Sequence, residues 1–182
     1  MKEIEPLINS GHIHFGENKV QEAIQKWQDT KILHENLKLH MVGKLQTNKV
    51  KQAVSIFDYI HSLDNIKLAK KISIEQKKIK KNLKIFIQVN LGNEEQKSGI
   101  DKKNLKEFYH ECKSQLDLNI IGLMCIPPNE IEVKSYFKEL AYLNNIHGLK
   151  DLSMGMSSDY LEAVSFGATF VRIGSKIFGN RF

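Results

Sequence analysis

The stretch KIFIQV, residues 84–89, decides the fold class of this 182-residue chain. Its apolar residues stand on both faces of an extended strand, as they do in a second run, IIGLMCI, at residues 120–126. A strand that is apolar on both faces is typical of a parallel sheet, because helices cover one face and other side chains cover the second. We therefore expect an α/β architecture.

Outward from these two runs, short β-branched segments alternate with amphipathic ones. In NKVQEAIQKWQ (18–28) and EVKSYFKELAYLNNI (132–146), apolar residues recur at helical spacing. The alternation of strand and helix predicts parallel strands joined by crossover helices. The expected strands are His12–Phe15, Leu39–Gly43, Tyr59–Ser62, Lys84–Asn90, Ile120–Ile126, Leu152–Gly155 and Phe170–Ile173.

The alternation fits two folds, a (β/α)8 barrel and a doubly wound sheet. No linker rich in Gly, Pro or Ser interrupts it, so we expect residues 1–182 to form one domain. The expected strands are one too few for a barrel, and the chain is shorter than the roughly 200 residues usual for that fold.

Charge and hydropathy argue against nucleic acid and membrane partners. The net charge is +6, but only Arg172 and Arg181 are arginines among the 27 basic residues. The densest basic run, 67–81, is threaded with isoleucines and predicts the solvated outer face of a helix. No segment approaches the roughly 18 apolar residues of a membrane helix. The first residues contain no apolar signal core, and we expect Cys112 and Cys125 to be reduced, so we expect a cytoplasmic protein.

Functional groups in parallel α/β proteins collect just after the strands. After the last expected strand comes RIGS (172–175), in which Gly174 and Ser175 can offer backbone N–H and hydroxyl groups to an anion. We expect Ser157 or Ser158, after the strand before, to cap the helix that follows them, with Asp159 in its first turn. The same pattern also fits an ordinary turn with serine caps.

Arg172 and the histidines are the other candidates. If Arg172 points inward, its guanidinium needs an acceptor: a ligand ring nitrogen or phosphate, or a carboxylate such as Asp64 or Glu17. His12, His14, His40 and His61 fall near strand starts without an acidic cluster at ligand spacing. They are interpreted as packed or hydrogen-bonded histidines, and no metal site is expected.

Ordered motifs resemble one known family, the YggS-like pyridoxal 5'-phosphate (PLP) homeostasis proteins. They are FGENKVQEAIQKW, LHMVGKLQTNKVK, HSLD, QVNLGNEEQKSGI, GLMCIPP and LSMGMSSDYLEAVSFGATFVRIGSKIFGNRF. The motifs are weak singly but specific as an ordered set that runs from Gly11 to Arg181.

The resemblance implies a TIM barrel of the alanine racemase N-terminal type, with PLP as ligand and PLP homeostasis as the role rather than an enzymatic reaction. It places Ser157, Gly174 and Ser175 in a phosphate cup, to which Met156 contributes its backbone. It sets Arg172 opposite the pyridine nitrogen and Asn18 beside the cofactor. Implied partners are PLP and PLP-dependent apoenzymes, and the complete protein is expected to be a monomer.

One part of the family pattern has no match in this sequence. The family's Schiff-base lysine ends a first strand that would lie upstream of Met1, so we expect an N-terminally truncated barrel of about seven strands. Lys49, Lys97 or Lys176 could act as a surrogate amine. The alternatives are a non-functional or misannotated truncated product and a barrel that binds another phosphorylated metabolite. A racemase-like reaction would need an amine and a second acid/base that the sequence does not display.

Overall fold

The parallel sheet follows the order of the chain around a ring. In the computed structural model, which describes residues 2–92, 98–128 and 132–179, the strand order is β1-β2-β3-β4-β6-β7-β8 and every pairing is parallel. A short strand, β5, pairs with β4 outside this path. The strands are β1 (His14–Glu17), β2 (Lys38–Met41), β3 (Tyr59–Leu63), β4 (Lys84–Asn90), β5 (Ile100–Asp101), β6 (Ile120–Met124), β7 (Asp151–Met156) and β8 (Phe170–Arg172).

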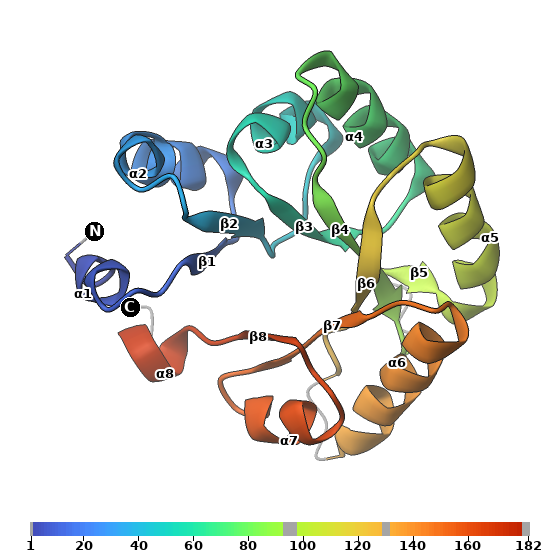
Figure 1. The fold of residues 1–182 in the computed structure, drawn as a ribbon. Helices are drawn as coiled ribbons and strands as arrows, with labels where there is room; N and C mark the ends of the chain where they lie inside the picture. Colours follow the sequence, from blue (N-terminus) through green and yellow to red (C-terminus); the bar gives the residue numbers. More distant parts are fainter. Residues whose placement is uncertain (1, 93–97, 129–131, 180–182) are drawn as a thin grey trace.

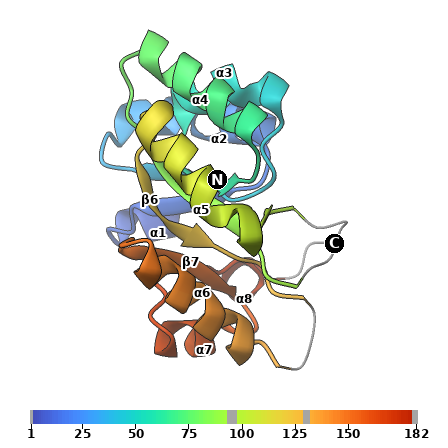
Figure 2. The ribbon, with the colours of Figure 1, turned by 90° about the vertical axis from the view of Figure 1, so that its right-hand side faces the viewer.

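Helices cover the outside of this ring, as Figure 1 shows. In the side view of Figure 2, α4, α5 and α6 lie over the outer face of the strands. The helices are α1 (Glu5–Asn9), α2 (Val20–Leu33), α3 (Val50–Ile56), α4 (Ile66–Lys78), α5 (Leu105–His110), α6 (Lys134–Ile146), α7 (Tyr160–Ser165) and α8 (Ser175–Phe178). Single turns η1 (Thr47–Lys49) and η2 (Lys102–Asn104) precede α3 and α5, and the π-helical η3 (Glu111–Gln115) extends α5.

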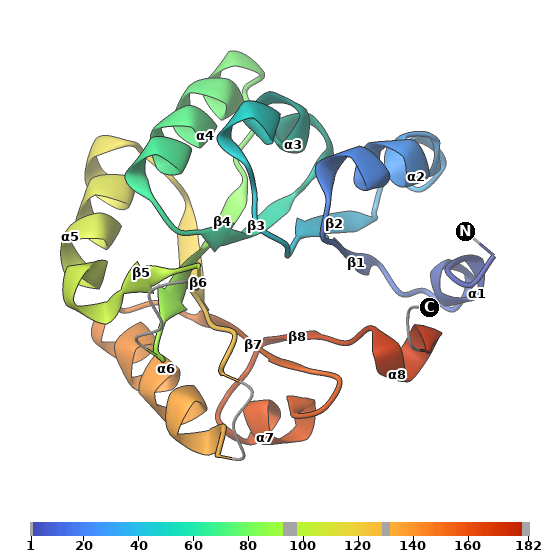
Figure 3. The same ribbon diagram turned by 180° about the vertical axis from the view of Figure 1, so that it is seen from behind.

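The strand order distinguishes the two folds that the sequence allows. A doubly wound sheet reverses its strand order at a switch point, whereas this sheet follows the chain without reversal. The fold is therefore the α/β barrel of the TIM type, with seven strands in a nearly closed ring, and the prediction is confirmed. Within the described residues β1 and β8 do not pair with each other, and the open side between α1 and α8 is seen in Figures 1 and 3.

The expected strands lie where the alternation placed them, with ends that shift by one or two residues. Lys84–Asn90 agrees with β4 at both ends. The two-residue β5 was not expected, because it is too short to carry a periodic signal. The basic run falls on α4, where Leu68 and Ile72 are buried and the lysines face outward, as predicted for an outer helix.

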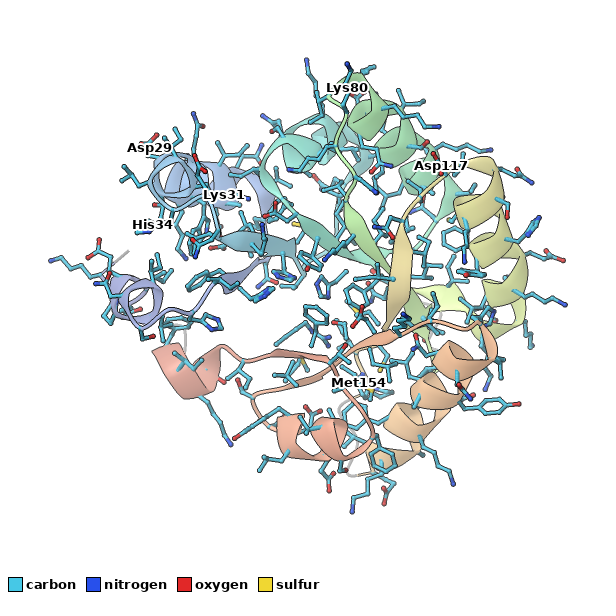
Figure 4. All side chains as sticks on the ribbon, in the orientation of Figure 1. Asp29, Lys31, His34, Lys80, Asp117 and Met154 are labelled. Carbon is cyan, nitrogen blue, oxygen red and sulfur yellow. The ribbon has the colours of Figure 1, made fainter. Side chains whose placement is uncertain are left out.

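The apolar side chains form two packed regions. The larger lies between the helices and the outer face of the sheet; Met154, labelled in Figure 4, lies there on the side of β7 that faces α6 and α7. The smaller fills the ring, where Tyr59, Phe86 and Met124 pack with Phe170. TIM barrels usually fill this space with branched aliphatic residues. Here aromatic residues share it with the buried polar residues His40, His61 and Ser153.

Both cysteines are buried and free, in agreement with the sequence. Burial is the main cause that raises the pKa of each thiol to about 12. No helix in the described ranges is both long and apolar enough to cross a lipid bilayer.

Candidate functional site

The loops after β7 and β8 meet at the carboxyl end of the sheet. Met156 ends β7 and pairs in register with Arg172, which ends β8. One residue beyond Met156, the Ser157 hydroxyl accepts a hydrogen bond from the backbone N–H of Gly174 at 3.1 Å. Ser175 follows as the first residue of α8. Four residues that the sequence singled out therefore lie together with Arg172.

The surface at Gly174 is open. Its φ of −125° is accessible to any residue, and an added Cβ would meet no atom within 4 Å in the part of the chain that the structure describes. Ser175 is exposed. The first N–H groups of a helix have no partner inside the helix, so those of Ser175 and Lys176 remain for an external acceptor.

The caps of α7 differ from the prediction. Asp159, not Ser157 or Ser158, is the N-cap residue, and no side chain caps the helix. The Asp159 carboxylate instead accepts the backbone N–H of Met156 at 2.6 Å. This bond folds the loop back on β7 and leaves Ser157 to contact Gly174. The backbone N–H of Met156 is thus already bound inside the protein.

Arg172 points inward, but not to a carboxylate. Its two terminal nitrogens donate to the Ser153 hydroxyl and to the Cys125 carbonyl oxygen, both at 2.8 Å. The expected carboxylate partners were wrong. Glu17 accepts from Trp27 and Lys26 instead, and the half-buried Asp64 accepts from Asn65. Burial lowers the pKa of the Arg172 guanidinium, which still carries more N–H donors than its two bonds use.

Asn18 lies at the same end of the sheet, after the other terminal strand of the ring. It follows β1 and lines a pocket of about 330 Å³ together with residues from the ends of β2, β4 and β6. The chain there is held close to β2: a Cβ at Gly43 would lie 2.3 Å from the Asn18 carbonyl oxygen. The other lining residues are Val42, Gly43, Lys44, Gln88, Ser98 and Ile126.

This pocket and Arg172 are linked through the end of β6. Ile126 lines the pocket, and the residue before it, Cys125, binds the guanidinium through its carbonyl. Lys44 also lines it, and the sequence did not single out this amine. Its position directly after the Gly43 turn was the available signal. Of the expected surrogate amines, Lys176 lies over the Tyr160 ring at 4.8 Å, Lys49 ends η1, and Lys97 lies outside the described residues.

Three histidines form a line of hydrogen bonds through the ring. His14 Nδ1 lies 2.9 Å from His40 Nε2, and His40 Nδ1 lies 2.9 Å from His61 Nε2. His61 Nδ1 then lies 2.8 Å from the Ser153 hydroxyl that Arg172 binds. The expectation of hydrogen-bonded histidines is confirmed. Within the described ranges, no group of three His, Cys, Asp or Glu side chains is arranged to hold a metal.

Burial holds these histidines neutral. It lowers the pKa of His40 to about 3 and is also the main cause that lowers the pKa values of His14 and His61. The positive charge of neighbouring groups adds to the effect at each of them. The histidines therefore meet Ser153 and Arg172 as uncharged donors and acceptors.

Comparison with known proteins identifies the family. The model of the alanine racemase N-terminal domain matches residues 1–181. The pyridoxal phosphate homeostasis protein of Aquifex aeolicus is 40% identical over 190 residues, which cover 98% of this chain and 81% of that protein. The homologue in Escherichia coli bears the same name and is 34% identical, covering 98% of this chain and 80% of its own. The chain belongs to the pyridoxal phosphate homeostasis protein family.

Solved structures agree with this family assignment. PipY of Synechococcus elongatus, determined with PLP bound, superposes with a TM-score of 0.90 at 34% identity and covers 98% of this chain and 87% of its own. An alanine racemase of Clostridium difficile gives a TM-score of 0.75 at 12% identity, with 99% of this chain and 48% of its own covered. At that identity the likeness concerns the fold alone. The family is named for PLP homeostasis and not for a catalysed reaction.

Proposed function

We propose that this chain binds PLP at the carboxyl end of the barrel, by a phosphate cup and ring contacts, and serves to hold and pass on the cofactor. The observation that carries the proposal is the contact of Ser157 with Gly174 beside Arg172. It brings the Ser157 hydroxyl and the first backbone N–H groups of α8, both for a phosphate, next to a guanidinium for a ring. The family membership and the PLP bound to PipY support the same ligand.

The residues fit PLP in three respects. The open space at Gly174 admits an anion, and Ser157, Gly174 and Ser175 would hold the phosphate, with Met156 at its side. The pocket beside Asn18, about 330 Å³, is within the usual range for small-ligand sites. Arg172 retains N–H donors for the ring nitrogen.

PLP supplies an aldehyde and an aromatic ring that can act as an electron sink. A guanidinium donates hydrogen bonds and does not give up its proton, so Arg172 would keep the ring nitrogen unprotonated. An unprotonated ring is a poor electron sink. This choice of partner favours carriage over catalysis, and we propose no enzymatic turnover.

We further propose that PLP is held without a Schiff-base lysine in this chain. Lys44 is the amine that lines the pocket, and Lys49, Lys97 and Lys176 are the other candidates for a surrogate bond. PLP-dependent apoenzymes would receive the cofactor. We propose that the protein acts in the cytoplasm and consists of one domain. We also propose that it is a monomer, and light scattering during gel filtration would test this oligomeric state.

Absorbance titration of the purified chain with PLP tests the proposal. We expect the free-aldehyde spectrum to persist on binding, and affinity to fall in Ser175→Ala and Arg172→Ala, while Ser165→Ala on α7 serves as a matched control. A new band that borohydride removes, and that Lys44→Met abolishes, would show a lysine adduct instead.

Ligand choice separates PLP from other phosphorylated metabolites. Pyridoxal lacks the phosphate and simple sugar phosphates lack the ring, so each should bind more weakly than PLP. Equal competition by sugar phosphates would favour a general phosphate site. Absence of PLP binding by the wild-type chain would refute the proposed function.

A further inference from the structure

A continuous line of hydrogen bonds crosses the barrel interior and ends at Arg172. It starts at the exposed His14 on β1, passes through His40 on β2 and His61 on β3, and reaches Ser153 on β7. Arg172 on β8 completes it through Ser153. With Arg172, five strands contribute one side chain each. We call the four residues that lead to Arg172 the interior relay: His14, His40, His61 and Ser153.

Arg172 fixes the direction of every bond in the interior relay. A guanidinium only donates, so the Ser153 oxygen accepts from it. Ser153 is fully buried, and among the described residues its own O–H has one acceptor within reach, Nδ1 of His61. A buried hydroxyl that donated to nothing would be costly, so His61 Nδ1 accepts.

The same argument continues along the histidines. His61 is neutral and uses Nδ1 as an acceptor, so its proton is on Nε2 and is donated to His40 Nδ1. His40 in turn donates from Nε2 to His14 Nδ1. All three imidazoles are therefore Nε2–H tautomers, and each bond points away from Arg172.

Aromatic rings shield the relay from water. His40 stacks on Tyr59 with ring centroids 4.1 Å apart, and His61 stacks on Phe86 at 4.4 Å. Phe170 packs against both histidines. Exposed fractions of 4% for His40 and 1% for His61 leave little access for water that would compete for these bonds. The stacked rings also prevent the imidazoles from rotating.

We propose that Ser153 and His61 are positioning residues that set the plane of the Arg172 guanidinium, with His40 holding His61 in the required tautomer. The proposal rests on the function above, in which Arg172 faces the ring nitrogen. The Cys125 carbonyl is the second fixed contact, so acceptors from β7 and from the end of β6 bind two different nitrogens. Two such contacts orient a planar fork, whereas one leaves it free to turn.

Nitrogen-15 NMR of the ligand-free protein tests the direction of the relay without PLP. We expect His40 and His61 as Nε2–H tautomers, and we expect Arg172→Met to perturb the His61 nitrogens because Ser153 loses its donor. His110, exposed on α5, should not respond. Nδ1–H tautomers at His40 and His61, or unchanged His61 resonances in Arg172→Met, would overturn the relay.

PLP binding tests the positioning role. Ser153→Ala removes a bond that orients Arg172, and His61→Phe removes the acceptor that orients the Ser153 hydroxyl. We expect each to weaken PLP binding about tenfold. Each should also shift the nitrogen-15 resonance of the bound pyridine ring. His61→Gln keeps an acceptor and a donor, so it should restore much of the affinity, and His110→Phe is the matched control.

The outcomes separate the two proposals. If the wild-type chain binds PLP and these variants match it in affinity and ring-nitrogen resonance, the positioning role is overturned while the PLP-binding function stands. If Ser153→Ala or His61→Phe loses its fold, PLP binding by His61→Gln still tests the positioning role, and the wild-type tautomers still test the direction of the relay. If the wild type binds no PLP, the proposed function fails together with the positioning role, and the relay direction is judged from the tautomers alone.

Discussion

The backbone N–H of Gly174 donates to the hydroxyl of Ser157 over 3.1 Å, which joins the loop after β8 to the loop after β7. None of the described residues fills the space at Gly174, where an added Cβ would find no atom of theirs within 4 Å. The serine oxygen can accept this bond and still donate its own proton. The pair therefore presents a hydroxyl donor beside an open backbone surface, an arrangement suited to an anion.

Ser157→Ala should weaken binding of PLP and of inorganic phosphate about tenfold, because one hydroxyl donor to the phosphate is lost and the two loops separate. Calorimetric titration measures both ligands, and pyridoxal, which has no phosphate, should be unaffected. Ser165→Ala is the control, since Ser165 is exposed and its hydroxyl donates to the Glu162 carbonyl within α7. An unchanged affinity for PLP in Ser157→Ala would remove Ser157 from the proposed cup.

Glu17→Ala should destabilise the fold by about 1–3 kcal/mol. The Trp27 ring is almost completely buried and its Nε1–H donates to the Glu17 carboxylate at 2.6 Å, so the variant leaves a buried donor without its acceptor. Glu17→Gln retains an oxygen acceptor and should recover part of the loss. Urea unfolding measures the free energy of each variant.

An exposed ion pair at the start of α2, the helix of Trp27, provides the comparison for Glu17. Glu22 contacts Lys19 at 2.7 Å with both side chains more than half exposed, and such pairs contribute little, about 0–1 kcal/mol. Glu22→Ala should therefore leave stability nearly unchanged. If Glu17→Ala costs no more than Glu22→Ala, the buried bond to Trp27 is not a source of stability.

Stability should fall with acid because of the interior histidines. Burial lowers the pKa of His40 from 6.5 to about 3, so the unfolded chain takes up a proton at a pH where the folded chain does not. The contribution is complete above about pH 6.5 and is lost as the pH falls toward 3. Each such histidine adds about 1.4 kcal/mol per pH unit to the slope in this range.

Urea unfolding between about pH 6.5 and 5 measures that slope. His40→Gln removes one titrating group and should reduce the slope by about one proton equivalent, whereas the exposed His110→Gln should not. Identical slopes in wild type and His40→Gln would show that His40 is protonated in the folded protein in this range.

The sequence predicted the alternating strands and helices because each of them carries its own periodic pattern. That pattern fitted both a barrel and a doubly wound sheet, and the resemblance to the family implied the barrel. The run KIFIQV lies within β4, and the expected bounds Lys84–Asn90 agree with the strand at both ends. The sequence also singled out Ser157, Gly174 and Arg172, because they lie just after strands or at the end of one. These features are local, and local patterns are what a single sequence records.

The contacts between strands could not be predicted in the same way. Arg172 binds a backbone carbonyl, at Cys125, and a serine 19 residues away, and neither has a chemical signal of its own. The histidines stood out as residues, but their alignment depends on the stagger of the three neighbouring strands β1, β2 and β3. The cap of α7 also differed from the prediction. Asp159 takes the N-cap position that was expected for a serine, and its carboxylate accepts a hydrogen bond from the backbone N–H of Met156.

Gly155 and Gly167 separate backbone strain from close packing at the β7–α7 contact. Both have φ of +89°, where any other residue pays about 1–3 kcal/mol. A Cβ on Gly155 would lie 2.5 Å from the Ala163 Cβ and 3.1 Å from the Tyr160 Cα, whereas one on Gly167 would meet only the end of Leu152 at 4.0 Å. Gly155→Ala should therefore cost more than Gly167→Ala, by about 1–3 kcal/mol for overpacking. Because Gly155 precedes Met156 and α7 would be displaced, PLP affinity should fall only in Gly155→Ala. Urea unfolding and PLP titration of the two variants measure both effects, and equal losses of stability would mean that α7 does not pack closely on β7.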